Sequence, residues 1–283
     1  MKRLSYITKF CLTIEFFYII FSLFVTASFS QQTTEIRLAS RVKQLDEFFS
    51  RFNFITDILG NKIVGKDTAI VTINGVSKTL TRRLQISALI DMMKNHKDSD
   101  AEFINDICSN GYLLNFYDKD WYAVATCNVV YKGKDVLLNL ILKNEVYPDN
   151  RSKWVITGAD ADFLNTIPDP KDKNSIISPV SNDLNFQELS KAFSHPENLK
   201  QFFVQDFSLD PTSVFYALLQ SKQLQFKGVK SIRYHFLQIK DWAFTVDFFN
   251  RSEGNSGWLL SDIISIKENE KNNYKKQVLK LKL

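Results

Sequence analysis

The sequence predicts an α+β protein made of two similar units, each with helices followed by an antiparallel sheet. Apolar residues recur at three- and four-residue spacing early in each half, and apolar and polar residues alternate later in each half. The strings Lys132-Gly133 and Lys240-Asp241 interrupt the alternating segments at the length of a tight hairpin turn. The tripeptide Asn-Arg-Ser recurs at 150–152 and 250–252, each time before a strand that contains tryptophan, which favours a duplicated unit.

The first thirty residues have the layout of an export signal. A basic start that contains Lys2 and Arg3 precedes an apolar stretch at 16–29, which ends in small residues. We therefore predict a signal peptide at 1–30 and an exported chain in the periplasm, the cell envelope or the extracellular space. An uncleaved N-terminal anchor is the alternative, although the apolar stretch is short for a full membrane span.

The charge balance argues against nucleic acid as a partner. The chain has 36 Lys and Arg against 31 Asp and Glu, a formal net charge of +5. Part of this excess lies in the leader and in the basic tail at 267–283, which has six lysines and two glutamates. The remaining body is close to neutral and lacks the broad basic face that nucleic-acid binding requires.

The cysteines and histidines predict neither a metal site nor a cofactor. Cys11 lies in the leader without the small residues that precede a lipidated cysteine, and Cys108 and Cys127 could form a disulfide or remain separate buried thiols. One cysteine pair cannot supply four zinc ligands. The histidines stand alone in the sequence, without a partner at metal-ligand spacing: His96, His195 and His235.

The first unit is assigned to residues 31–167. The apolar pattern predicts helices at 36–53, 84–94 and 98–109, and the alternating pattern predicts strands at 121–131, 134–145 and 153–162. With Lys132-Gly133 as the turn, Thr126 lies opposite Asn139 on a face that also carries Tyr122. That face is too apolar for full exposure, so it packs on the other unit, forms a homodimer or binds a ligand. Tyr122, Thr126 and Asn139 are therefore candidate binding residues.

The second unit follows a surface linker. Residues 166–180 hold three of the six prolines, so we place the linker at 168–180 and the second, shorter unit at 181–266. This unit is expected to have helices at 185–193, 198–203 and 211–222 and strands at 231–239, 242–250 and 258–266. The tail at 267–283 is expected to be a frayed, solvated terminus, with an added edge strand or contact with an anionic membrane surface as alternatives.

The order of elements resembles a known superfamily. The helical string 41–53, the meander of strands and the string Lys153-Trp154-Val155-Ile156 resemble the cone-shaped domains of the nuclear transport factor 2-like superfamily, which has a cystatin-like fold. Over residues 36–266 the chain looks like exported proteins of Gram-negative bacteria that carry two such units in tandem. The resemblance implies two cone-shaped units, each with helices packed on a bent antiparallel sheet. The superfamily contains isomerases, dehydratases, hydrolases and non-catalytic binding modules, so the fold does not choose a function.

An isomerase of that kind needs a carboxylate base and a hydrogen-bond donor in one dry pocket. The polar residues of the second sheet are the candidates for these roles: Asp247, Asp262, Tyr234 and His235. Tyr234 and His235 are consecutive and point to opposite faces of a strand, and solvated sheet positions are the simpler interpretation.

The sequence contains no glycine-rich phosphate loop, nucleophile elbow or HExxH string. We therefore expect an exported, non-catalytic binding or assembly module for a small molecule or a protein. A small-molecule isomerase or hydrolase acting in a cone pocket is the alternative. A peripheral protein of the cell envelope is a third hypothesis.

Overall fold

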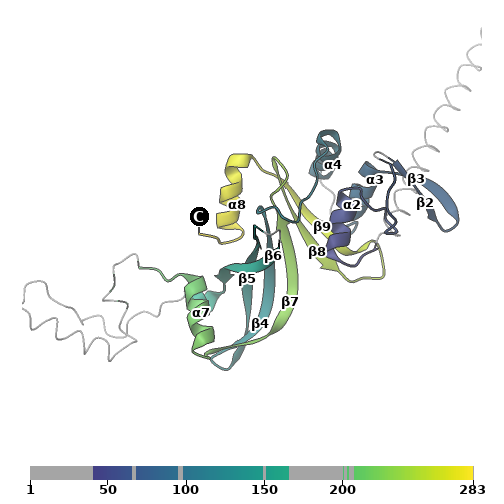
Figure 1. Cartoon of the computed structure of the whole chain (residues 1–283). Coiled ribbons are helices and arrows are strands. Elements are labelled where there is room, and N and C mark those ends of the chain that lie inside the picture. Colours follow the sequence, from purple (N-terminus) through teal and green to yellow (C-terminus); the bar gives the residue numbers. More distant parts are fainter. Residues whose placement is uncertain are drawn as a thin grey trace, which may run out of the picture. The chain divides into compact units, whose positions relative to one another are not determined.

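The computed structural model describes residues 41–65, 68–94, 98–148, 151–165, 200, 203 and 207–282 (Figure 1). The predicted signal peptide at 1–30, the linker at 168–180 and the helix at 185–193 lie outside these residues, as do His96 and His195.

The described elements alternate between helices and strands along the chain. They are β1 (Arg41–Val42), α2 (Leu45–Phe52), β2 (Thr68–Ile73), β3 (Val76–Thr81), α3 (Arg82–Leu89), α4 (Asp98–Asn110), β4 (Trp121–Tyr131), β5 (Lys134–Val146), β6 (Ser152–Asp160), α5 (Asp162–Asn165), α7 (Pro211–Gln220), β7 (Leu224–Phe236), β8 (Trp242–Phe249), β9 (Ser256–Ser265), a short 3-10 helix (Glu268–Glu270) and α8 (Lys271–Gln277).

The α+β class is confirmed, with a seven-stranded mixed sheet and a separate small hairpin. The strand order is β1-β9-β8-β7-β4-β5-β6, and β2 pairs only with β3. The sheet is mixed because β1 runs parallel to β9, whereas β8 pairs antiparallel with both β7 and β9. Strands from both sides of the proline-rich segment share this sheet, so the structure gives no evidence for two tandem cone-shaped units. The alternation of apolar and polar residues shows which side chains of a strand face the core, but it does not show which strands will be neighbours in the sheet.

The chain packs as two compact units that each combine segments from both halves of the sequence. Of the described residues, those within 41–122, 146–152 and 233–271 belong to the first unit, and those within 123–145, 153–232 and 272–282 belong to the second. Both units thus draw on segments from either side of the predicted linker.

The core of the first unit is aromatic. It buries α2 against β8, and Phe52 stacks on Phe244 with ring centroids 5.9 Å apart. The amphipathic pattern behind the predicted helix at 36–53 is real, but among the described residues the helix spans only Leu45–Phe52. Arg41 and Val42 form a strand instead, because they pair with β9 and the Val42 side chain is fully buried.

The β2–β3 hairpin was missed by the sequence analysis. Its turn is Asn74-Gly75, and both residues have positive φ, 51° and 80°. Asn-Gly is the preferred pair for a two-residue hairpin turn, so the signal was present in the sequence. The inner face of the hairpin packs Val71 and Leu80 into a small core that also contains Phe54, Ile58 and Ala88.

The second unit confirms the first predicted hairpin. Lys132 and Gly133 have the positive φ values, 49° and 76°, that a tight turn between β4 and β5 requires. Thr126 donates a 2.8 Å hydrogen bond to Asn139, as the predicted register requires. Cys127 is buried here, and Cys127 and Cys108 are both free thiols, so the disulfide that the sequence left open does not form.

The second predicted hairpin has a different register. Phe236 pairs with Phe244, so residues 237–241 form the connection in place of a two-residue turn at Lys240-Asp241. This one-residue shift places Phe236 on the aromatic core face where Leu237 was expected. The stacking of Phe236 on Phe244, 4.9 Å between centroids, favours the observed register.

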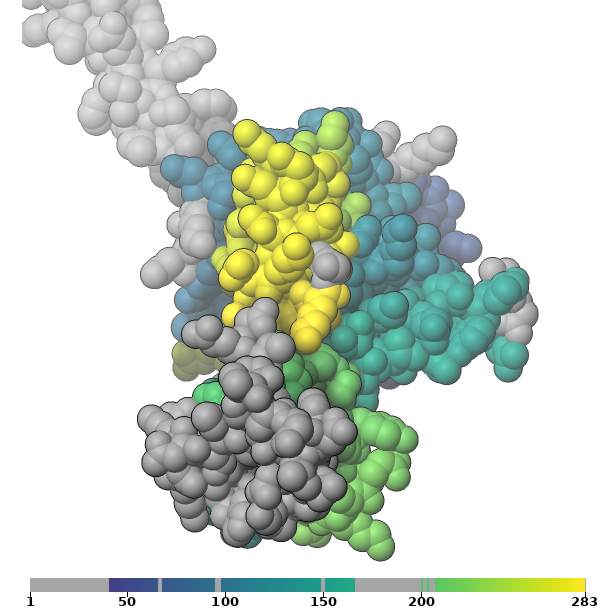
Figure 2. Space-filling model, turned by 90° about the vertical axis from the view of Figure 1, so that its left-hand side faces the viewer, coloured from purple at the N-terminus to yellow at the C-terminus, as the bar shows by residue number. Residues whose placement is uncertain are grey.

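The expectation of a frayed C-terminus was wrong. The tail forms α8 and then buries Leu279 and Leu281, and Figure 2 shows this segment in yellow on the surface. The Lys271 ammonium is buried and donates hydrogen bonds of 2.7 and 2.8 Å to the carbonyls of Leu237 and Ile239. These bonds fix the start of α8, since the carbonyls between β7 and β8 have no strand partner there.

Within the part of the chain that the structure describes, no helix is long and apolar enough to cross a membrane.

Candidate binding site

The candidate catalytic residues lie on β7, β8 and β9 of the seven-stranded sheet, and they point to two different faces of it. Tyr234 faces the aromatic core, with its ring centroid 5.0 Å from that of Trp258, and burial raises the pKa of its hydroxyl. His235 points to the opposite face and is only 5% exposed. Burial lowers the pKa of His235 to about 4, helped by the positive charge of Arg233 and opposed by the carboxylate of Asp247.

Neither candidate carboxylate is placed to act with His235: Asp247 is bound by an arginine, and Asp262 lies two strands away. The Asp247 carboxylate accepts hydrogen bonds of 2.9 and 3.0 Å from the Arg233 guanidinium. Asp262 lies opposite Thr245, which lies opposite His235, so β8 separates Asp262 from the imidazole. The structure therefore brings Asp247 to an arginine, and it does not bring Tyr234, His235 and Asp262 into one pocket.

Two of the three candidate binding residues of the first hairpin are hydrogen-bonded to each other, and the third is buried. Thr126 and Asn139 are joined by their hydrogen bond, and Tyr122 is buried at 7% exposure. This face is partly covered by the chain itself: a Cβ at Gly158 would lie 3.3 Å from both Leu281 and Ile141. The C-terminal tail is thus one occupant of the apolar face that the sequence assigned to another domain, a homodimer or a ligand.

Two open cavities flank β1 in the first unit, and the sequence analysis predicted neither. One, here called the aromatic pocket, has a volume of about 500 Å³ and is lined by residues 41–43, 248–252, 256 and 257. The other, here called the polar pocket, has about 480 Å³ and lies between β1, α2 and the loop that follows α2. Arg41 and Lys43 line both, so β1 is a wall that the two cavities share.

Gly257 allows β1 to form this wall. Its φ is +93°, and a Cβ added to it would lie 1.9 Å from the carbonyl oxygen of Val42. A side chain at this position is excluded by both the backbone conformation and the contact. Val42 is fully buried between Arg41 and Lys43, so strand alternation directs those two charged side chains away from the core.

The loop from β8 to β9 forms the opposite wall and is held by a polar cluster. Arg251 forms an ion pair with Asp91 and donates a 2.9 Å hydrogen bond to the carbonyl of Asn255. The fully buried Asn255 amide donates to the carbonyls of Ala88 and Ile90, at 2.9 and 2.6 Å. Arg251 is the central residue of one Asn-Arg-Ser repeat, and its role here is to anchor the loop.

The aromatic pocket is cationic and partly apolar. Its ten described lining residues include Arg41, Lys43 and Arg251 and no Asp or Glu. Phe248 is 50% exposed, and the Arg251 guanidinium lies 4.8 Å from the ring centroid of Phe249. Exposed cations beside an exposed aromatic ring suit a ligand that carries an anionic group on an aromatic or apolar body.

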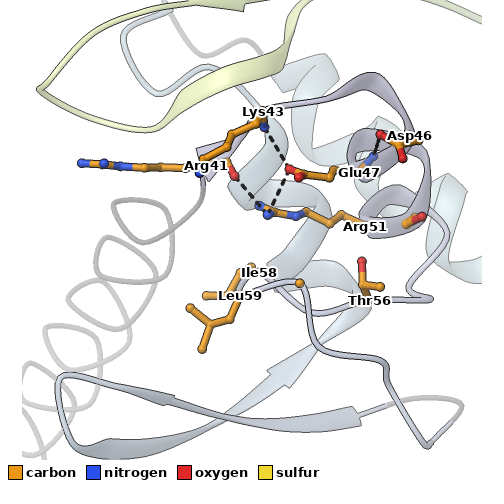
Figure 3. Close-up of a pocket in the computed structure, with 10 residues that line it drawn as sticks. Arg41, Lys43, Asp46, Glu47, Arg51, Thr56, Ile58 and Leu59 are labelled. Carbon is orange, nitrogen blue, oxygen red and sulfur yellow. Dashed lines mark hydrogen bonds and ion pairs between the residues drawn. The ribbon is translucent and has the colours of Figure 1, made fainter.

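The polar pocket contains charges of both signs that are largely engaged (Figure 3). Arg51 donates a 3.0 Å hydrogen bond to the carbonyl of Arg41 and lies 3.7 Å from the Glu47 carboxylate. Glu47 also accepts a 2.9 Å hydrogen bond from the backbone N–H of Lys43. Burial lowers the pKa of Arg51, and the carboxylates of Glu47 and Asp57 oppose that shift. This network holds the Arg41–Lys43 segment in place from the side opposite the aromatic pocket.

No group of three or more His, Cys, Asp or Glu side chains among the described residues is placed to hold a metal ion. No protein-family model matches the chain, and no curated protein or solved structure matches it either. The fold defines an α+β protein with a seven-stranded mixed sheet and a separate small hairpin.

Proposed function

We propose that the chain is an exported, non-catalytic binding module that takes a small anionic ligand into the aromatic pocket. The observation that carries this proposal is the lining of that pocket, in which three cations and an exposed phenylalanine meet and the described residues include no carboxylate. Arg41 and Lys43 supply charge for an oxyanion, and Phe248 supplies a ring against which an apolar body packs. Arg251 pairs with Asp91 at the side of this pocket, and Arg41 and Lys43 are the two cations that the proposal assigns to the ligand.

The isomerase or hydrolase hypothesis is less well supported by the geometry. A general base must reach the proton that it removes, and the Asp247 carboxylate instead accepts two hydrogen bonds from Arg233. His235 and Tyr234 lie on opposite faces of β7, so they cannot act on one substrate from that strand. We therefore favour binding over catalysis.

Phenyl phosphate is a simple probe of the aromatic pocket. We expect the double variant Arg41→Gln/Lys43→Gln to weaken its binding about tenfold, because two exposed charge-assisted contacts together contribute roughly 1.4 kcal/mol. Isothermal titration calorimetry on the full chain at low ionic strength measures this. Raising the salt concentration is expected to weaken binding to the unchanged chain as well.

The matched control removes the same charge elsewhere. Lys134→Gln/Lys230→Gln neutralises two exposed lysines outside the pocket, and we expect it to leave the affinity unchanged. Benzyl alcohol, which has the ring without the anion, is expected to bind much more weakly. Equal loss of affinity in both double variants, or no binding of phenyl phosphate to the unchanged chain, would contradict the proposal.

The export part of the proposal rests on the leader and is tested separately. We expect the full chain, produced in a Gram-negative host, to be recovered outside the cytoplasm with its first thirty residues removed. N-terminal sequencing of the protein from the periplasmic and extracellular fractions checks this. Recovery of an intact N-terminus in the cytoplasmic fraction would refute export and leave the pocket argument untouched.

A further inference from the structure

The outer edge of β6 has the features of an edge that accepts another strand. β6 is the terminal strand in the order of the seven-stranded sheet, and no strand among the described residues pairs with its outer edge. It spans nine residues, Ser152–Asp160, without proline. Natural sheets protect such edges with proline, bulges or charges, because an open edge recruits another strand. The one lysine of β6, Lys153, lies near its start, and its ammonium is 3.8 Å from the Glu145 carboxylate on the same chain.

One face of β6 is apolar up to its edge. Trp154, Ile156 and Gly158 alternate along this face. Trp154 is 39% exposed and Ile156 is 46% exposed, whereas Gly158 is buried and lies beneath Leu281. Large exposed apolar side chains beside an open edge are the features by which strands add to one another.

We propose that two copies of this chain associate through antiparallel pairing of β6 with β6, with Ile156 on the two-fold axis. In this register Ile156 lies opposite Ile156 of the partner subunit, and Trp154 lies opposite Gly158 of the partner subunit. The space above Gly158 is already filled, because a Cβ there would lie 3.3 Å from both Leu281 and Ile141 of the same chain. In this register each indole ring packs against the side chain that covers Gly158 of the partner subunit, so the four large residues of the two copies form one apolar strip.

The charges along β6 select the antiparallel direction. Lys153 is the second residue of the strand and Asp160 is its last, and Asp162 lies two residues further on. Antiparallel pairing brings the basic end of each copy to the acidic end of the other, whereas parallel pairing would place like charges side by side. A two-fold interface is also the one that closes on itself without forming filaments.

The axis position gives a sharp test. We expect the full chain to form a dimer in sedimentation-velocity experiments, and Ile156→Lys to weaken that dimer at least tenfold by placing two like charges on the axis. Ile70→Lys is the matched control, since Ile70 is 78% exposed on the separate β2–β3 hairpin, and it should leave the dimer intact. A chain that stays monomeric throughout, or a control that dissociates as much as Ile156→Lys, overturns the proposal.

Cysteine cross-linking tests the register independently of stability. In a Cys11→Ser background, Ile156→Cys is expected to form an intermolecular disulfide with copper phenanthroline as oxidant, because paired Cα atoms lie within disulfide reach. Trp154→Cys is expected not to, since each such residue would lie opposite Gly158 of the partner subunit. Cross-linking of both variants, or of neither, contradicts this register. Binding of phenyl phosphate is a separate readout, because the aromatic pocket uses β1 at the other end of the strand order.

Discussion

Gly257→Ala is expected to detach β1 from the sheet and to abolish binding of phenyl phosphate. The added Cβ would lie 1.9 Å from the Val42 carbonyl oxygen, a contact with backbone that cannot rotate away. The φ of +93° adds strain for any L side chain. Loss of β1 exposes the buried Val42 side chain, so we expect the free energy of unfolding to fall by roughly 3 kcal/mol. Urea denaturation followed by circular dichroism measures this loss.

Gly75→Ala separates the effect of the contact from that of the backbone conformation. Gly75 has a similar φ, +80°, but a Cβ there would meet nothing within 4 Å. We expect this control to cost only about 1 kcal/mol, the penalty of the left-handed conformation alone, and to leave binding of phenyl phosphate intact. If Gly257→Ala costs no more than Gly75→Ala, the close approach of β1 to β9 is not a structural requirement.

Acidification is expected to destabilise the fold through His235. The pKa of this buried imidazole is lowered to about 4, against an ordinary value of 6.5, first by burial and then by Arg233. Between these two pH values the unfolded chain binds a proton at this site and the folded chain does not, so unfolding is favoured as the pH falls. The stability present above pH 6.5 is lost progressively down to about pH 4, and the total is on the order of 3 kcal/mol.

His235→Gln isolates this contribution, because it removes the titrating group and leaves the other histidines in place. We expect the free energy of unfolding of the variant to change less between pH 7 and pH 4.5 than that of the unchanged chain. Urea midpoints measured across this range in parallel give the difference. Identical pH profiles for the two proteins would show that the imidazole is accessible and titrates normally in the folded state.

Local patterns in the sequence predicted local structure well. The helix that begins at Pro211, α4 and the Lys132-Gly133 turn were all predicted, because capping and turn residues act over a few positions. Sheet order was not predictable in the same way. The resemblance to tandem cone-shaped units suggested two sheets, but the edges of β4 and β7 meet in one, and no local pattern specifies that pairing.

The aromatic pocket could not be predicted from the sequence for a related reason. The aromatic pocket joins residues 41–43 to residues 248–257, segments that are more than two hundred positions apart. The Asn-Arg-Ser string at 250–252 lines the pocket, but in the sequence it indicated a duplicated unit and not a binding site. Gly257 was a second local signal, a glycine at the start of a strand, and such a position marks a close approach of another backbone segment. The candidate residues chosen from the sequence were selected by chemical type, and most of them have partners within the sheet.

The most direct test of the proposed function is a map of where an aromatic anion binds. Titration of the isotope-labelled chain with phenyl phosphate, followed by amide chemical shifts in NMR, locates the site residue by residue. We predict saturable shifts for the amides of residues 41–43 and 248–257, and unchanged amides around Asp262 and Asn139. Shifts centred on the amides around His235 in β7 and Thr245 in β8, or no saturable shifts for residues 41–43, would contradict the assignment of the aromatic pocket as the binding site.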